Sequence, residues 1–374
     1  MKRPAIAVLL AAAALVLACG GGSNHATEAS PDALRVPELP PVPPVPELPG
    51  DPVTPQKIAL GTDIFFDKRL SGSGHTSCQA CHAYTISFQD NLPLSTPDRS
   101  YPGDTPLLPR NTLSFMNIVY APVFRWDGSH TDIVQVMAFP LAEPNMNVAK
   151  LPVGSDAADV GAAQPALYRK LTVDLPGYQA VYRDAFGVDI ATLDAKAVWA
   201  LTGRALRAFV TQAVSRDAPF DRWNAGDDSA MDASAVRGLA VFKGTGRCII
   251  CHHGPFFTDF SFHNLSTAWR SDGTRGDQGR FLVTGDHADR GKFLTPTLRQ
   301  TYDTSPYFHD GSRPGLRDVI THLSSPAVTA DPNHDPVFNT PLALSSADTT
   351  DLIAFIRALR APMTATITPP SAFP

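Results

Sequence analysis

The pattern of apolar and polar positions along the chain predicts a mainly helical protein. From Ala195 to Ser215, "AKAVWALTGRALRAFVTQAVS", apolar residues recur three and four positions apart, which indicates an amphipathic helix. The stretch from Ser346 to Arg360 has the same spacing and begins with two possible N-caps, Ser346 and Asp348. Its expected buried face consists of Leu352, Phe355 and Leu359. Because strand-like alternation is sparse, the predicted fold class is all-α, with long loops rich in proline and glycine.

A different apolar run occupies the N-terminus. Lys2 and Arg3 precede the run from Ala5 to Ala18, which is too short to span a membrane stably and is typical of an export signal. Its end, Leu-Val-Leu-Ala-Cys, resembles a bacterial lipoprotein box, in which Cys19 is acylated after cleavage. The alternative is an ordinary signal peptide with a coincidental cysteine. Gly20 is not the aspartate that often retains lipoproteins at the inner membrane, so we expect a periplasmic protein anchored by lipid, with the outer membrane favoured.

Composition divides the rest of the chain and excludes one class of partner. After a signal peptide at residues 1–18, residues 19–55 are rich in proline and predict an extended tether between the membrane and the body. At 374 residues, the chain is long enough for two domains. A formal net charge of −5, with 18% charged residues, gives no indication of nucleic-acid binding.

Two short motifs carry the chemistry: "SCQACH" at residues 77–82 and "RCIICH" at residues 247–252. Of the five cysteines, the four other than Cys19 all lie in these motifs. Cysteines this close form disulfides mainly in special redox sites, and a zinc site would leave the histidines unexplained. Cys-x-x-Cys-His is the attachment pattern of c-type haem, because one helical turn presents two thiols and an imidazole on the same face. The expected haem-binding residues are Cys78, Cys81, His82, Cys248, Cys251 and His252.

The surroundings of the two motifs also repeat. "LGTDIFFDKRLSGSGHTSCQACHAYTISFQD" and "GLAVFKGTGRCIICHHGPFFTDFSF" share an aromatic helix end, small residues, the haem motif and then Phe-x-Asp. This repeat predicts two tandem cytochrome-c-like domains, at residues 56–220 and 221–374, each with one covalent haem.

Further motifs resemble the bacterial di-haem cytochrome c peroxidase and MauG-type family over residues 56–361. They are "IFFDKRLSGSG", "PRNTLSFMN", "FRWDGS", "FTDFSFHN", "TPTLRQTYDTSPYFHDG" and "LIAFIRAL". The resemblance implies that the first haem meets peroxide and that the second relays or stores electrons. It places Trp126 between the haems as an electron relay; the alternative is an aromatic side chain that only packs an interface. It also implies a calcium ion bound by Asn111 and the carbonyl groups of Thr304 and Pro306, although Leu113 replaces a usual proline beside that site.

At the first haem the sequence departs from the peroxidase pattern. No histidine lies between Ala83 and Ser129, so we expect an open first iron without reductive activation. His130 is the next histidine, in a loop where we expect it to be solvated. Asn145 stands at the family's glutamate position, and an asparagine can hold peroxide but cannot transfer its proton. Glu143 is the candidate substitute; the alternative is an exposed loop carboxylate.

At the second haem, Leu323 occupies the place of the family's distal methionine or tyrosine and cannot bind iron. His322, one residue earlier, is the possible replacement, but one position rotates a helical side chain by about 100°. Either His322 is a ligand or the second iron is open. In both cases we expect no high-potential His/Met haem.

These features leave three possible functions. The protein reduces hydrogen peroxide with electrons from a small periplasmic cytochrome c or cupredoxin, or it uses peroxide to oxidise a partner protein in the manner of MauG. The alternative is a non-enzymatic di-haem electron carrier or haem sensor. The open first haem favours the enzymes, and the altered ligands favour the MauG-type reaction.

Overall fold

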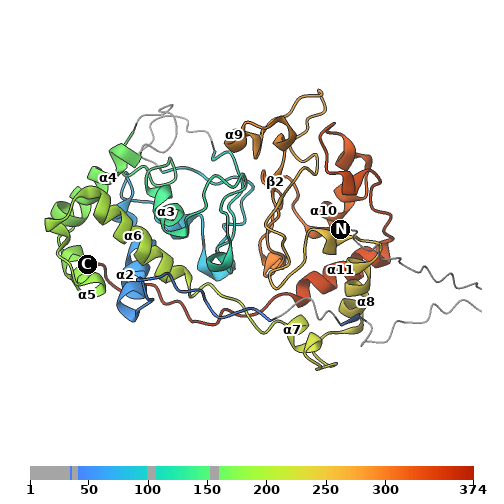
Figure 1. Cartoon of the computed structure of the whole chain (residues 1–374), viewed down its shortest axis with the longest axis horizontal. Coiled ribbons are helices and arrows are strands. Elements are labelled where there is room, and N and C mark those ends of the chain that lie inside the picture. Colours follow the sequence, from blue (N-terminus) through green and yellow to red (C-terminus); the bar gives the residue numbers. More distant parts are fainter. Residues whose placement is uncertain (1–33, 36–40, 99–106, 152–159) are drawn as a thin grey trace, which may run out of the picture.

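The computed structural model describes residues 34–35, 41–98, 107–151 and 160–374. These residues build two hydrophobic cores, the first mainly from residues 60–214 and the second from residues 220–359 (Figure 1). The predicted helical character is confirmed, since the strands form only one short antiparallel pair within this part of the chain. The helices are α2 (Pro55–Phe66), α3 (Ile133–Ala138), α4 (Val160–Arg169), α5 (Gly177–Phe186), α6 (Ala195–Val210), α7 (Pro219–Asn224), α8 (Ala233–Lys243), α9 (Phe281–Thr284), α10 (Leu316–Leu323) and α11 (Ser346–Ala358), and the strands are β1 (Phe262–His263) and β2 (Phe293–Leu294).

In the first core, helix α2 crosses helix α6. Thr54 caps α2 by accepting a hydrogen bond from the amide of Lys57, and the next residue is a proline, which suits the first helical turn. At the crossing, a Cβ on Gly61 would lie 2.1 Å from the carbonyl oxygen of Ala205. Only glycine therefore allows the two helices to pack at this distance. Helix α6 ends at Val210, before the predicted end at Ser215.

Helices α8 and α11 form the matching crossing in the second core. A Cβ on Gly238 would lie 1.9 Å from the carbonyl oxygen of Asp351. The N-cap of α11 is Ser345, whose hydroxyl accepts from the amide of Asp348, while the Asp348 carboxylate accepts from Ser345 in return. The sequence prediction was therefore wrong by one residue at Ser346, whereas Asp348 belongs to the cap as its third helical residue.

An aromatic triad fills the centre of each core, and the two triads correspond. Each contains one ring from the helix before the Cys-x-x-Cys-His motif, one from just after the motif and one from the last helix of the core. In the first triad, the ring centroids of Phe65 and Phe209 are 4.4 Å apart and those of Phe65 and Phe88 are 6.0 Å apart. In the second, the centroids of Phe242 and Phe355 are 5.0 Å apart and those of Phe242 and Phe257 are 6.0 Å apart. The triads are Phe65, Phe88 and Phe209, and Phe242, Phe257 and Phe355. The repeat seen in the sequence is therefore also a repeat of packing.

Part of the predicted tether lies against the body. The carbonyl of Pro43 accepts hydrogen bonds from Tyr120 and Arg216, both at 2.8 Å. Asp51 is buried and forms ion pairs with Lys57 and Arg204. The predicted signal peptide, at residues 1–18, and Cys19 lie outside the described residues. Within the described residues, no helix has the length and apolar character needed to cross a membrane.

The C-terminal segment returns to the first core. After α11, the amide of Thr364 donates to the carbonyl of Val214 at 2.8 Å, and Ile367 is buried among residues of the first core. Arg69 donates to the carbonyl of Pro374 at 2.9 Å. In Figure 1 the C-terminus accordingly lies beside α5, far from α11. The predicted domain boundary at residue 220 remains a prediction. The end of the chain, which that boundary assigns to the second domain, packs on the first core.

Candidate active site

The first Cys-x-x-Cys-His motif forms a tight 3₁₀ turn, Cys78–Ala80, rather than a turn of α-helix. The carbonyl of Cys78 accepts from the amides of Cys81 at 3.3 Å and His82 at 2.9 Å. Burial raises the pKa of Cys78 to about 12 and that of Cys81 to about 11, so neither free thiol would be a thiolate at neutral pH.

The second motif has nearly the same geometry. Its 3₁₀ turn, Cys248–Ile250, places the amides of Cys251 and His252 at 3.3 and 2.8 Å from the carbonyl of Cys248. All four cysteines in the described part of the chain are unpaired. A disulfide, one of the alternatives for these motifs, is therefore absent from them.

Both motif histidines are oriented by a backbone carbonyl. Nδ1 of His82 lies 3.1 Å from the carbonyl oxygen of Phe88, and Nδ1 of His252 lies 2.8 Å from that of Phe257. Burial lowers the pKa of each imidazole to about 4, so each is neutral. A neutral imidazole that donates from Nδ1 offers the lone pair of Nε2 to a metal. Two reduced cysteines and such a histidine on one turn fit a covalently bound haem in each half.

A continuous apolar cavity connects the two halves. It reaches the second motif at Cys248, Cys251 and His252, whereas no residue of the first motif lines it; loops of both halves and helices α8, α10 and α11 build its wall. Positions on the two sides correspond at a constant separation of 183 residues, as for Trp126 and His309. The other lining pairs are 111 and 294, 112 and 295, 113 and 296, 114 and 297, 116 and 299, 118 and 301, 121 and 304, 123 and 306, 124 and 307, and 125 and 308. The repeat thus extends well beyond the segments that the sequence comparison aligned.

Trp126 lies at the boundary of the two halves and lines the cavity. Its indole N–H donates to the carbonyl of Asn111 at 2.8 Å, and its own carbonyl accepts from Leu294 of the second half at 2.8 Å. Its ring packs with Ala268 and Phe293. This position is compatible both with an electron relay and with interface packing.

The three residues expected to bind calcium, Asn111, Thr304 and Pro306, all line the cavity. The Asn111 amide group donates to the carbonyls of Leu92 and Pro93, at 2.8 and 3.2 Å. Its side-chain oxygen has only a 3.5 Å contact with Gln89, so this oxygen is available to a cation. The site would offer neutral oxygen atoms, which calcium accepts.

The expected peroxide-handling residues do not line the cavity themselves. Glu143 is largely buried, and its carboxylate accepts from Arg125 at 2.7 Å; Arg125 does line the cavity. Burial raises the pKa of Glu143, although Arg125 opposes that shift. Asn145 is half-buried in the same loop. His130 is half-buried and packs edge-on against Phe139, so its predicted solvation is incomplete.

Helix α10 turns Leu323 toward the cavity and His322 away from it. Nε2 of His322 lies 2.8 Å from the carbonyl oxygen of Leu265, and Nδ1 lies 3.1 Å from the guanidinium of Arg313. Of the two possibilities for the second haem, this geometry favours the one without His322 as a ligand.

Two features of the site escaped the sequence analysis. Beside Cys251, His263 is held by the carboxylates of Asp259 and Asp335. The neighbouring Cys251, as a free thiol, and the carboxylates of Asp335 and Asp259 raise the pKa of His263 to about 10. Cys251, Asp259 and His263 are close enough to hold a metal ion together, but Cys251 belongs to the haem motif. The only available signal was the Asp-x-x-x-His spacing of Asp259 and His263, which is too common to use.

The second missed feature is an ionic bridge between the halves. Arg110 pairs with Asp127 at 2.6 Å and with Asp277 of the second half at 2.7 Å. Arg280 donates to the carbonyls of Asp127 and Gly128 at 2.9 and 2.7 Å. These contacts fix the loop that carries Trp126 against the second half.

Comparisons with known proteins agree with this geometry. A family model for di-haem cytochrome c peroxidase matches residues 55–229. The chain is 32% identical over 361 residues to the methylamine utilization protein MauG of Methylorubrum extorquens, covering 95% of this chain and 93% of that protein. The chain belongs to the di-haem cytochrome c peroxidase family. It is also 32% identical over 371 residues, 92% of each chain, to cytochrome-c peroxidase IdrP1 of Denitromonas iodatirespirans.

Solved structures of this family have the same fold. A MauG-like protein associated with microbial copper homeostasis superposes with a TM-score of 0.70 at 25% identity, covering 87% of this chain and 95% of that one. The diheme peroxidase BthA of Burkholderia thailandensis gives a TM-score of 0.68 at 21% identity, covering 86% and 90%. The predicted family is confirmed. Membership makes the protein an oxidoreductase, and it implies two c-type haems with peroxide and an electron donor or protein substrate as partners.

Proposed function

We propose that the protein is a MauG-type peroxidase with two tandem cytochrome-c-like units, each carrying one covalent haem. The six residues of the two motifs would hold the haems, with Nε2 of His82 and of His252 as the iron ligands. When bound, the haems supply the redox chemistry: peroxide takes up two electrons and two protons and becomes two water molecules. The observation that carries the proposal is the pair of matching motif turns, whose imidazoles are both oriented for metal binding, in a chain whose halves share one cavity.

Residues of the first half would transfer the proton of peroxide and pass the electron vacancy left by the reaction to the second half. Arg125 and Glu143 form an ionisable pair in the first half, and a positioned acid or base of this kind can move a proton of peroxide. Trp126 bridges the halves and has an oxidisable ring. We propose that electrons reach the second haem from an aromatic side chain of a partner protein, as in the MauG-type reaction, or from a small periplasmic cytochrome c or cupredoxin.

The proposal includes the cellular setting and one ion. Acylation at Cys19 would anchor the protein to a membrane facing the periplasm, and labelling with a radioactive fatty acid, with Cys19→Ala as control, tests it. Calcium would bind at Asn111, Thr304 and Pro306. Metal analysis after chelation, before and after Asn111→Ala, should show one ion per chain that the variant lacks.

The decisive experiment treats the fully oxidised protein with one equivalent of hydrogen peroxide, followed by optical and EPR spectroscopy. We expect both haems to change within the mixing time, without prior reduction. A carrier or sensor would show no reaction, and a gated peroxidase would react only after one-electron reduction. The pyridine haemochrome assay should give two haems per chain, and one after the double change Cys81→Ala, His82→Ala; two haems in that variant would contradict the assignment.

A further inference from the structure

Helix α10 presents one apolar face to the cavity. The lining residues follow the helical spacing of three and four positions, so they lie along a single stripe. They are Leu316, Val319, Ile320 and Leu323. None of these side chains has an atom that binds iron or donates a hydrogen bond.

This stripe forms a wall of the cavity apart from the haem motif. Helix α8 leads directly into the second motif, and α11 crosses α8 at Gly238, so both helices belong to the side of His252. Helix α10 lines the same cavity from a separate segment of the chain. A haem held by His252 would therefore share this cavity with the stripe of α10.

Two hydrogen bonds hold the buried side chain of His322 in its orientation away from the cavity. A carbonyl accepts only from an N–H, so Nε2 carries the proton and donates to Leu265 at 2.8 Å. Nδ1 is then the acceptor for Arg313 at 3.1 Å. Both ring nitrogens are used, and His322 is 6% exposed. Turning the ring to the cavity would break both bonds and leave the carbonyl of Leu265 without this donor.

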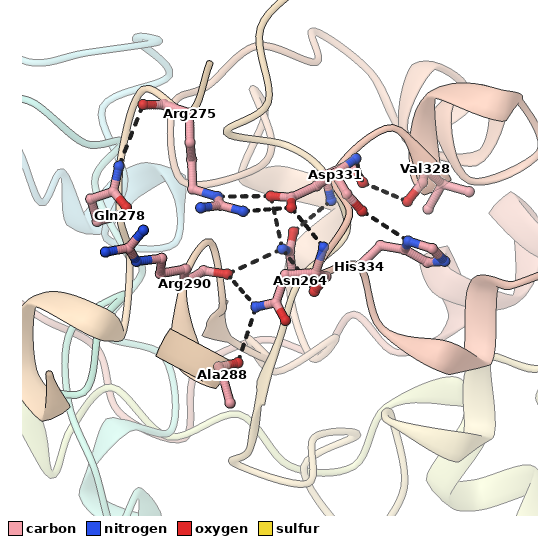
Figure 2. Close-up of polar contacts among 10 residues, drawn as sticks. Asn264, Arg275, Gln278, Ala288, Arg290, Val328, Asp331 and His334 are labelled. Atoms are coloured by element: carbon pink, nitrogen blue, oxygen red, sulfur yellow. Dashed lines mark hydrogen bonds and ion pairs between the residues drawn. The ribbon is translucent and has the colours of Figure 1, made fainter. Parts of the chain in front are cut away.

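The carbonyl of Leu265 is itself held rigidly, because both neighbours of Leu265 are attached to the segment after α10. Figure 2 shows Asp331 between Asn264 and Arg275; Asn264 donates to it at 3.0 Å and Arg275 at 2.8 Å. The hydroxyl of Ser266 donates to the carbonyl of Val328 at 2.7 Å. Burial opposes the ionisation of Asp331, but the hydrogen bonds from Arg275 and Asn264 outweigh it and lower its pKa.

The other possible donors of the cavity are engaged elsewhere. Apart from the motif itself, the lining residues with an iron-binding atom, in the part of the chain that the structure describes, are Met116, His263, Tyr307 and His309. His263 is held by two carboxylates, and the hydroxyl of Tyr307 donates to a backbone carbonyl at 3.0 Å. His309 stacks on Phe293 at 3.7 Å and its Nδ1 lies 3.3 Å from the hydroxyl of Thr267, while Met116 is buried in the first core.

We infer that the second haem binds a small neutral ligand, such as carbon monoxide or nitric oxide, on the side of α10. This rests on the proposed attachment of that haem at Cys248, Cys251 and His252. The apolar stripe admits an uncharged diatomic molecule, and it lacks a donor that would stabilise bound peroxide or help to cleave it. The second haem is thus a ligand-binding site that does not perform the peroxidase reaction.

The test is a titration of the dithionite-reduced holoprotein with carbon monoxide, followed in the Soret band, with EPR of the oxidised protein as the second measurement. We expect two molecules of carbon monoxide per chain and a high-spin signal from each haem. Leu323→Met would supply a ligand and convert the second haem to low spin. Leu316→Met, on the same stripe two turns earlier, is the matched control and should leave it high-spin. His322→Gln should change neither measurement.

The outcomes separate this inference from the open first haem. One carbon monoxide per chain, with its binding impaired by Leu323→Met, would uphold the inference and contradict the open first haem. One carbon monoxide that Leu323→Met leaves unchanged would overturn the inference. So would a low-spin second haem in the oxidised wild type, and a return to high spin in His322→Gln would identify His322 as the ligand.

Discussion

Glu143→Gln tests the role of the ion pair at the cavity wall. The carboxylate of Glu143 lies 2.7 Å from the guanidinium of Arg125, and its side chain is 15% exposed. Glutamine has nearly the same shape and can still accept a hydrogen bond from Arg125 through its carbonyl oxygen. It cannot take up or release a proton near neutral pH. The substitution therefore removes the proton transfer and preserves most of the packing.

Heterolytic cleavage of peroxide requires one proton to move from the inner to the outer oxygen atom. A positioned acid or base contributes typically ~10²–10⁴-fold to such a step, equivalent to about 3–5 kcal/mol. We expect Glu143→Gln to slow the peroxide reaction by that factor in stopped-flow measurements. Because burial raises the pKa of Glu143 and its ionised form is the base, the wild-type rate should fall as the pH drops below this raised value. The variant should lack this pH dependence.

Asn145→Glu supplies the matched comparison, because it introduces a carboxylate at the position to which the family resemblance assigns a glutamate. If Glu143 is the base, Asn145→Glu adds little to the wild-type rate. If Glu143→Gln has no effect and Asn145→Glu accelerates the reaction, the acid–base position is 145. A fast reaction that neither substitution alters would refute our placement of the peroxide site.

Three further results are expected. Trp126→Phe should leave the reaction of the first haem intact and slow oxidation of the second haem by at least about tenfold in rapid-mixing spectra. A bridging side chain that is harder to oxidise by about 1.4 kcal/mol has this effect on the rate. Unchanged kinetics would show that Trp126 has only a structural role. Helix propensity alone predicts that Gly238→Ala stabilises the protein, but the 1.9 Å contact with Asp351 should instead destabilise it by about 1–3 kcal/mol, which calorimetry would detect as a lower Tm. Arg110→Met should cost about 3–5 kcal/mol in urea unfolding at neutral pH. Because Arg110 outweighs burial and lowers the pKa of Asp277, this stabilisation exists above about pH 4 and is lost in acid, so the variant should differ little from wild type at low pH.

The features that the sequence predicted best depend on local spacing. The two motif turns require only residues i, i+3 and i+4, and helices α6 and α11 follow from apolar periodicity. The predicted ends of these helices were less accurate, because a cap depends on a single hydrogen bond. Residues 345 and 346 are both serines, and only the hydrogen bond from the amide of Asp348 identifies Ser345 as the N-cap.

Features that depend on distant contacts could not be predicted. Pro43 was assigned to a free tether because its neighbours cannot build a core, yet its carbonyl binds Tyr120 and Arg216. The orientation of His322 depends on the carbonyl of Leu265, which lies 57 positions earlier in the chain. Backbone carbonyls leave no mark in a sequence, so the sequence left both possibilities for His322 open.

The correspondence of the two halves also explains how they can differ in chemistry. Their motif turns and aromatic triads match, so the scaffold of each haem site is the same. The paired positions of the cavity wall differ: Arg125 of the first half corresponds to Phe308 of the second. Arg125 brings a charge and the carboxylate of Glu143, whereas Phe308 brings neither. The half with the ion pair can move protons at peroxide, and the half with the apolar wall is suited to electrons and uncharged ligands.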